Sequence, residues 1–220
     1  MMDSLHQKRC LIVGAAPLSD DGWLLEKVHT SDFCIGADGG CAHLQRVGRT
    51  PDLAIGDFDS GVKPRDIPIQ TFPVEKDDTD AMLAVKWALE QGFCSFSLVG
   101  MLGGRLDHTI AAIQTLYYLF CHGAQGTLEG PGQWATFLLG GGTLEIPRQE
   151  GCTLSVFSYS QKVEGLTLRG VQYPLEKGSL TNGFPLGVSN HFAAPVAQIT
   201  LETGALLVLV CEEKNTSWNI

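Results

Sequence analysis

The arrangement of apolar runs constrains the fold most, because it changes character near Gly123. Before this point, short apolar runs alternate with segments of helical spacing. The runs read RCLIVG, DFCIGA, DLAIGD and CSFSLVG, with TFPV as a weaker candidate, and the helical segments cover residues 19–28, 41–47, 79–91 and 106–121. Such alternation is typical of βαβ units, since parallel strands are buried on both faces and need crossover helices between them. We predict an N-terminal α/β domain over residues 1–124 with a Rossmann-like, mostly parallel sheet.

After this point, no helical pattern of comparable length occurs. The chain gives short β-like runs, among them WATFLL, TLSVFSY, AQITLE and LLVLV, separated by Gly- and Pro-rich turns such as GPGQ and LGGG. Short strands with frequent turn residues are typical of sandwiches and barrels. We therefore expect the α/β domain to be followed by an all-β sandwich domain over residues 125–220.

Charge and composition limit the partners and the compartment. The formal net charge is −9, whereas nucleic-acid surfaces are usually basic, so we expect no nucleic-acid partner. No apolar segment approaches the roughly 20 residues of a membrane span, so we expect no membrane partner either. The seven cysteines form no C-x-x-C pair, and several lie inside apolar runs. This usage is typical of a reducing cytoplasm and not of a disulfide framework or a zinc site.

Several predicted strands of the first half end in glycine-containing turns. These are GAAP at 14–17, ADGG at 37–40, GDFDS at 56–60 and GMLGGR at 100–105. In an open parallel sheet the ligand crevice lies beyond the carboxyl ends of the strands, and glycines there let the backbone approach a phosphate. Any single turn is better explained as a tight strand-to-helix connection. Several turns with Asp or Arg on one edge favour a ligand site.

The GDFDS turn places two carboxylates close together. In an extended segment Asp57 and Asp59 point to one side, where they repel each other unless a cation is near. Oxygen ligands without a His or Cys partner suit Mg²⁺, which commonly takes one or two carboxylates plus waters and substrate phosphates. The alternative is a turn in which one of the two aspartates accepts hydrogen bonds from nearby backbone amides.

The KDDTD segment at 76–80 adds more carboxylates at the start of a predicted helix. Asp and Thr are good N-caps, but one residue is enough to cap a helix, so capping does not call for three aspartates. Asp80 could face the same crevice and join the metal site, and Lys76 could contact a phosphate.

The GGRLDHT segment at 103–109 begins the next predicted helix. Arg105 could bind a phosphate bidentately, while Asp107 could act on a nucleophile or orient a metal-bound water. The role of His108 stays open. The chain has no G-x-x-x-x-G-K-[ST] loop, no G-x-S-x-G elbow and no H-E-x-x-H motif. A nucleotide would therefore have to be held through metal-bound phosphates.

Five motifs together resemble a known family. ADGG, PDLAIGDFDS, KDDTDAMLA, GGRLDHT and GVSNHF occur in the order seen in thiamine pyrophosphokinases, and the resemblance covers about residues 13–210. It implies an α/β nucleotide domain followed by a β-sandwich, assembled as a homodimer with active sites between subunits. The implied partners are ATP and thiamine, and the implied reaction transfers a diphosphoryl group from ATP to the hydroxyethyl oxygen of thiamine, giving thiamine diphosphate and AMP.

The resemblance also implies roles for individual residues. Asp57, Asp59 and Asp80 would hold Mg²⁺, with Asp38 in support of this acidic cluster. The remaining implied roles are ATP binding by Asp38, Gly39, Lys76 and Arg105, participation of Asp107 close to the reacting groups, and thiamine binding by Ser189 and Asn190.

Two positions depart from the family pattern, and the acceptor has alternatives. Many bacterial relatives carry Glu where this chain has Met82, and many read S-N-E-F where this chain has His191 in place of Glu. The second departure lies close to the expected thiamine pocket. Trp134 and Trp218 are both candidates to stack on an aromatic acceptor. Two alternative interpretations stay open. The protein could be a diphosphokinase that acts on another acceptor, such as a pterin alcohol, or it could bind thiamine without catalysis.

Overall fold

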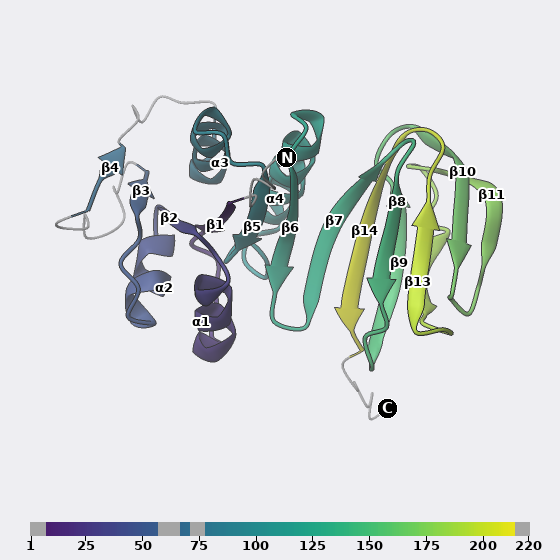
Figure 1. Cartoon of the computed structure of the whole chain (residues 1–220), viewed down its shortest axis with the longest axis horizontal. Helices are drawn as coiled ribbons and strands as arrows, with labels where there is room; N and C mark the ends of the chain where they lie inside the picture. The colour runs from purple at the N-terminus through teal and green to yellow at the C-terminus, as the bar shows by residue number, and fades with distance from the viewer. Residues whose placement is uncertain (1–7, 57–66, 71–77, 214–220) are drawn as a thin grey trace, which may run out of the picture. The chain divides into compact units, whose positions relative to one another are not determined.

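The computed structural model describes residues 8–56, 67–70 and 78–213 and divides into two compact units, Met1–Pro131 and Gly132–Ile220 (Figure 1). The strands of the first unit are β1 (Arg9–Val13), β2 (Phe33–Ala37), β3 (Leu53–Ile55), β4 (Ile69–Gln70), β5 (Ser95–Val99) and β6 (Gln125–Gly130). Its helices are α1 (Asp21–His29), α2 (Gly40–Arg46), α3 (Asp80–Glu90) and α4 (Leu106–Cys121). The four predicted helices are thus confirmed, and TFPV lies outside the described residues.

The strands of the first unit form one parallel sheet in the order β4-β3-β2-β1-β5-β6. From β1 the chain moves outward through β2 and β3, then returns to the other side of β1 as β5. Figure 1 shows α1 and α2 on one face of this sheet and α3 and α4 on the other. This change of direction between β1 and β5 is the place where open α/β sheets bind ligands.

Local sequence explains where the helices begin and what they bury. The carboxylate of Asp20 caps α1 by accepting a 2.9 Å hydrogen bond from the backbone N–H of Trp23, and Leu24 and Val28 of this helix are buried. These two side chains pack into a core cluster with Leu11 and Val13 of β1. The apolar stripe of the helix thus covers the central strand of the sheet.

The boundary between the units lies later than the sequence predicted. The segment 125–130, expected at the start of the second domain, is β6 and pairs in parallel with β5, for example Ser97 with Thr127. A short β-like run does not reveal which sheet it joins, because that depends on the partner strand. The first unit therefore ends at Pro131 and not at residue 124.

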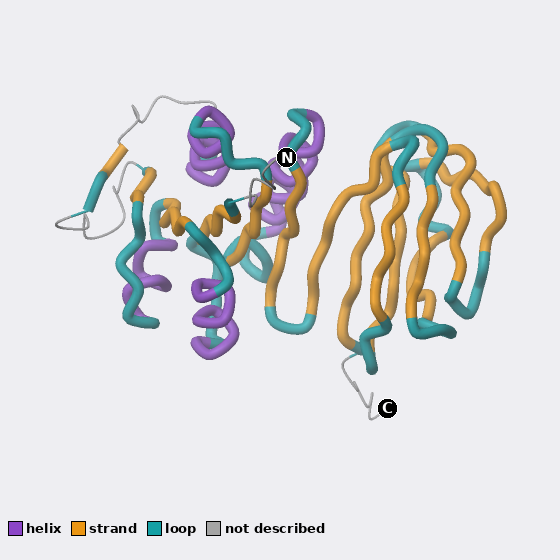
Figure 2. The backbone as a smooth tube through the Cα atoms, viewed as in Figure 1, coloured by secondary structure: helices purple, strands orange, loops and turns teal. Residues whose placement is uncertain are grey.

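The second unit consists of strands and loops in the part that the structure describes (Figure 2). Its strands are β7 (Gln133–Leu139), β8 (Thr143–Pro147), β9 (Cys152–Ser158), β10 (Lys162–Arg169), β11 (Leu175–Thr181), β12 (Gly187–His191), β13 (Val196–Thr200) and β14 (Ala205–Glu212). They form two antiparallel groups, β12-β9-β14-β7 and β11-β10-β13-β8. The two groups share one buried core cluster, to which Leu154 and Val208 contribute from the first and Val163 and Ile199 from the second. The prediction of an all-β second domain is confirmed.

Among the described residues, none of the helices combines the length and the apolar character that a bilayer crossing requires.

Candidate active site

A pocket of about 530 Å³ lies at the carboxyl ends of β1, β2 and β5, where the strand order changes direction. Its wall is built from the turns that follow these strands and from the first turns of α3 and α4. The lining residues that matter for the chemistry are Asp38, Asp78, Asp80, Arg105 and His108, with the backbone of residues 14–17. Three residues predicted from separate motifs, Asp38, Asp80 and Arg105, thus come together around one cavity, whereas Gly39 and Asp107 are not part of its lining.

Asp38 occupies a strained position in this wall. Its φ is +47°, in the left-handed region that non-glycine residues rarely adopt. The conformation is held because the Asp38 N–H donates to the carbonyl oxygen of Ile55 at 2.8 Å. Gly56 packs so closely that a Cβ there would lie 3.2 Å from the Asp38 Cα. Strain of this kind clusters at functional sites, and here it aims an acidic residue at the pocket.

Close packing requires the second glycine after Asp38 and leaves little room at the first. A Cβ on Gly40 would lie 1.8 Å from the carbonyl oxygen of Val13, and one on Gly39 would lie 3.0 Å from the Cβ of Ala15. The start of α2 therefore presses directly against the end of β1. The packing of α2 against β1 therefore explains the glycines of the ADGG motif, independently of the motif's predicted contact with ATP.

Thr79 is the residue that caps α3. Its hydroxyl accepts a hydrogen bond from the backbone N–H of Met82 at 3.2 Å. The neighbouring aspartates do not cap the helix. Asp78 forms an ion pair with Lys86 at 2.6 Å, and Asp80 lines the pocket. Lys76 lies outside the described residues. The expectation that capping does not account for all of these carboxylates agrees with this arrangement.

Arg105 and Asp107 form a bidentate pair at the start of α4. The Arg105 Nε donates to Asp107 Oδ1 at 3.1 Å, and its Nη2 donates to Oδ2 at 2.6 Å. Both side chains are exposed, at 74% and 62%. The hydrogen bonds from Arg105, helped by the His108 N–H, hold the pKa of Asp107 below its ordinary value. Asp107 is therefore a poor proton acceptor in this arrangement, and a phosphate would have to share Arg105 with it.

The metal site predicted from GDFDS is described only in part. Asp57 and Asp59 lie outside the described residues, and the last described residue before them, Gly56, packs against Asp38. Within residues 8–56, 67–70 and 78–213, no three His, Cys, Asp or Glu side chains are grouped closely enough to hold a metal ion. Asp38 and Asp80 nevertheless offer oxygen atoms along one pocket wall, which is the ligand chemistry that Mg²⁺ prefers.

Ser189 and Asn190 belong to the edge strand β12 of the second unit and differ in their surroundings. Ser189 is exposed with a φ of +57°, and its N–H donates to the Ser155 hydroxyl at 3.0 Å. Asn190 is buried; its Oδ1 accepts from the backbone N–H of Tyr173 and of His191, both at 3.0 Å, and its Nδ2 donates to the Tyr173 carbonyl at 2.9 Å. The Asn190 amide is thus occupied with backbone groups.

Of the two candidate stacking tryptophans, one lies outside the described residues. This is Trp218. Trp134 packs against the core cluster of the second unit, and its Nε1 donates to the Gln149 Oε1 at 3.3 Å. Its position is that of a core residue.

A group that the sequence patterns did not single out holds the turn after β1. His43 and Arg46 of α2 contact the carbonyl oxygens of Ala16 and Leu18, at 3.0 and 2.5 Å. His43 is a single histidine on a short helix and belongs to no recognisable motif. Its place in the helix that follows ADGG was the only sequence feature that pointed to it.

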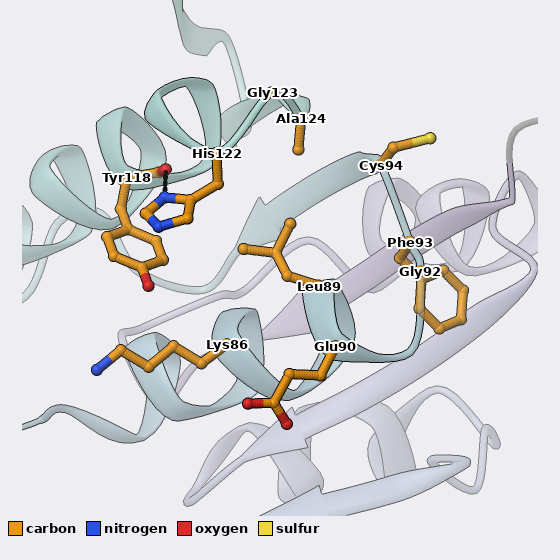
Figure 3. Close-up of a pocket in the computed structure, with 10 residues that line it drawn as sticks. All are labelled: Lys86, Leu89, Glu90, Gly92, Phe93, Cys94, Tyr118, His122, Gly123 and Ala124. Carbon is orange, nitrogen blue, oxygen red and sulfur yellow. Dashed lines mark hydrogen bonds between the residues drawn. The ribbon is translucent and has the colours of Figure 1, made fainter.

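A second hollow, of about 440 Å³, lies at the opposite edge of the sheet, where the chain enters β5 and β6 (Figure 3). Its wall includes Tyr118, whose ring stacks on His122 with 3.9 Å between centroids, and Cys94. Open α/β sheets bind ligands at the carboxyl ends of their strands, and this hollow is at the amino ends. Asp38, Asp80 and Arg105 line the first pocket instead.

Comparison with known proteins agrees with this geometry. Residues 25–126 match the family model described as thiamin pyrophosphokinase, catalytic domain, and residues 143–208 match the model for the thiamin pyrophosphokinase vitamin B1 binding domain. Thiamine pyrophosphokinase of Bacillus subtilis is 30% identical over 183 residues, covering 80% of this chain and 85% of that protein. This chain belongs to the thiamine pyrophosphokinase family.

Solved structures of the family have the same fold. The crystal structure of thiamine pyrophosphokinase from Bacillus subtilis superimposes with a TM-score of 0.85 at 28% identity, covering 94% of this chain and 100% of that one. The thiamin pyrophosphokinase of Geobacillus thermodenitrificans gives a TM-score of 0.80 at 26% identity, covering 94% and 99%. The resemblance inferred from five motifs is therefore confirmed. The catalytic-domain match contains Asp38, Asp80 and Arg105 of the pocket, and the B1-binding match contains Ser189 and Asn190.

Proposed function

We propose that this protein is a thiamine diphosphokinase, which transfers a diphosphoryl group from ATP to the hydroxyethyl oxygen of thiamine and releases AMP. The observation that carries this proposal is the gathering of Asp38, Asp80 and Arg105 around one pocket at the change of strand direction. Membership of the family supplies the reaction class. The same strand order supports the Rossmann-like description of the first unit.

ATP would bind in the pocket of the first unit. The turns at 14–17 and 100–105 bring backbone groups to the cavity, and small residues there leave room for phosphate oxygens. Arg105 would bind a phosphate through its planar guanidinium, and Lys76 would add a second positive charge. The pairing with Asp107 restrains the Arg105 side chain, which lines the pocket. We therefore assign to Asp107 chiefly the orientation of Arg105.

Carboxylates of the first unit would hold Mg²⁺. We assign the direct ligands to Asp57, Asp59 and Asp80, with Asp38 in support, because these residues carry oxygen ligands only. The ion would neutralise phosphate charge in addition to Arg105 and Lys76. The attack of the thiamine hydroxyl on the β-phosphorus breaks the bond between this phosphorus and the α–β bridging oxygen, and AMP leaves in line and keeps that oxygen.

Thiamine would be recognised with the help of the second unit. Ser189 is exposed and able to contact a ligand, whereas Asn190 would act by fixing the backbone of Tyr173. Thiamine is a cation, so the surplus of carboxylates favours its approach. We further propose a cytoplasmic homodimer with active sites between subunits, as the family resemblance implies.

AMP formation tests this proposal. Purified protein with Mg²⁺ and ATP is assayed with thiamine, with a pterin alcohol and without acceptor. We expect AMP to form only in the assay with thiamine, in proportion to the thiamine diphosphate produced. AMP with the pterin alcohol alone would assign another acceptor. Thiamine binding without AMP in any of the three assays would make the protein a binder and would refute the enzyme.

A further inference from the structure

The turn after β1, residues 14–18, is held from both sides. The N–H of Ala16 donates to the carbonyl oxygen of Gly100 at 2.7 Å, and the N–H of Gly14 donates to that of Val99 at 2.8 Å. On the opposite side, the carbonyl oxygens of Ala16 and Leu18 accept hydrogen bonds from His43 and Arg46. This segment lines the pocket to which we assign ATP, so its shape decides which backbone groups face the phosphates.

His43 contacts one of the pocket-lining turns and is connected through the backbone to two others. Its helix, α2, starts two residues after Asp38, and the beginning of that helix presses on the end of β1 at Gly40. The ring reaches Ala16, whose N–H is bonded to Gly100 in the turn after β5. The half-buried His43 side chain thus contacts the 14–18 segment directly, and it is connected to the Asp38 turn through α2 and to the Gly100 turn through Ala16.

The hydrogen bonds of His43 fix its protonation state. Arg46 has donors only, so its Nη1, 3.0 Å from the His43 Nδ1, requires a bare nitrogen there. The proton of the neutral ring is then on Nε2, which donates to the Ala16 carbonyl at 3.0 Å. Protonation would place an N–H at Nδ1 against the guanidinium, removing this hydrogen bond and adding repulsion between like charges.

We propose that His43 is a positioning residue for ATP: its neutral ring, together with Arg46, holds the 14–18 segment in the shape that receives the phosphates, and protonation of the ring releases it. This inference rests on the proposed function for the identity of the ligand. It extends that function by assigning a pH-dependent role to a residue outside the pocket lining.

The surroundings of the ring agree with a neutral state near pH 7. Burial lowers the pKa of His43 below its ordinary value near 6.5, and the charge of Arg46 adds to this, against the hydrogen bonds to Ala16 and Ala15. The charged groups that face the ring are Arg46 from α2 and Asp21 from α1, and these two are themselves paired at 2.6 Å. The segment itself contributes only the carbonyl groups of Ala15 and Ala16.

Two substitutions and a control test the inference. His43→Ala removes the hydrogen bond to Ala16 and should raise the Kd and KM for Mg²⁺-ATP about 2- to 10-fold at pH 7.5, with the KM for thiamine unchanged. His43→Gln can donate and accept in the same places but does not titrate. It should keep a near-normal ATP affinity at pH 7.5 and should not show the weakening of ATP binding that we expect in the wild type as the pH falls through the lowered pKa of His43. His29→Ala, exposed at the end of α1, should match the wild type.

Hydrogen exchange gives a readout that needs no activity. The amide of Ala16 should exchange faster in His43→Ala than in wild type, with amides of the second unit unchanged. Unaltered ATP affinity and Ala16 exchange in His43→Ala, or an acid-side weakening kept in His43→Gln, would overturn the inference. If the wild type binds ATP but forms no AMP, the proposed function fails while these binding and exchange measurements still decide on His43. No ATP binding by the wild type would refute both.

Discussion

The two units present their predicted functional residues in different ways. In the first, Asp38, Asp80 and Arg105 come from separate turns at the carboxyl ends of parallel strands and reach one pocket. In the second, Ser189 and Asn190 are consecutive residues of one edge strand, and one is exposed while the other is buried. Strand ends gather side chains from distant parts of the sequence, whereas neighbours within a strand face opposite ways. A motif in the first unit therefore indicates residues of one binding site. In the second unit, one residue of a motif is able to contact a ligand while its neighbour stabilises the backbone.

The largest effect is expected in the first unit, at Asp80. Asp80→Asn removes a charge from the pocket wall and should lower the rate of AMP formation about 10²-fold or more, because charge stabilisation dominates phosphoryl transfer. Glu90→Gln makes the same change at the exposed far end of α3 and should leave the rate unchanged. Steady-state kinetics with both variants measures this. Equal rates for Asp80→Asn and wild type would remove Asp80 from the site.

Arg105 should have the next largest effect. Arg105→Ala removes the guanidinium proposed to bind phosphate and should raise the KM for ATP about 10- to 100-fold, the usual effect of a lost charged hydrogen bond. The thermal midpoint should hardly change, since the pair with Asp107 is exposed. The control is Arg169→Ala, which breaks an equally exposed pair with Glu176 in the second unit. If both variants change the KM for ATP alike, the effect is not specific to the pocket.

Asn190 tests the supporting role in the second unit. Asn190→Ala removes three hydrogen bonds that involve Tyr173 and His191, and the free energy of unfolding of this unit should fall by about 1–3 kcal/mol. The KM for thiamine should rise more than the KM for ATP. Asn182→Ala, an exposed amide in the same unit, serves as the control. Urea unfolding and kinetics check both parts, and an equal rise in both KM values would contradict the division between units.

Glu129 links pH to the stability of the first unit. Burial alone would raise the pKa of this carboxyl, but hydrogen bonds from Lys27, Ser97 and Thr127 outweigh it and lower the pKa below its ordinary value near 4.5. A depressed carboxyl pKa stabilises the fold fully above the unfolded value, and this contribution is lost as pH falls through the folded value. Glu129→Gln should therefore lower the free energy of unfolding by about 1–3 kcal/mol at pH 7 and by less below pH 4.

Urea unfolding followed through Trp23, which lies beside Lys27, measures the Glu129 effect. Glu26→Gln on α1 makes the same charge change at an exposed position. A constant difference between wild type and Glu129→Gln from pH 7 to pH 3 would disprove the linkage.

The smallest effects on stability concern backbone strain, which occurs in both units. Among the described residues, the non-glycine residues with positive φ are Asp38, Lys177 and Ser189. Changing each to Gly should raise the free energy of unfolding by up to about 1 kcal/mol, because glycine adopts this conformation freely. Asp38→Gly and Ser189→Gly should also lose activity, whereas Lys177→Gly should not. Full activity in all three variants would mean that the strain has no functional meaning.

The sequence predicted the first unit better than the second for a physical reason. Parallel strands with crossover helices leave strong periodic signals, and their strand ends must share an edge, so the pocket around Asp38, Asp80 and Arg105 could be anticipated. The assignment of β6 could not, because its partner strand is not encoded locally. The hydrogen bonds of His43 and Asn190 were also out of reach, since they join side chains to distant backbone groups.

Hydrogen exchange in the presence of Mg²⁺-ATP tests the location of the active site most directly. ATP should protect the amides of residues 14–16 and 100–105, which surround the pocket at the carboxyl edge of the sheet. The amides at 92–94 and 122–124, around the hollow at the opposite edge, should not change. Protection at the second set without the first would place ATP at the wrong edge of the sheet and contradict the account.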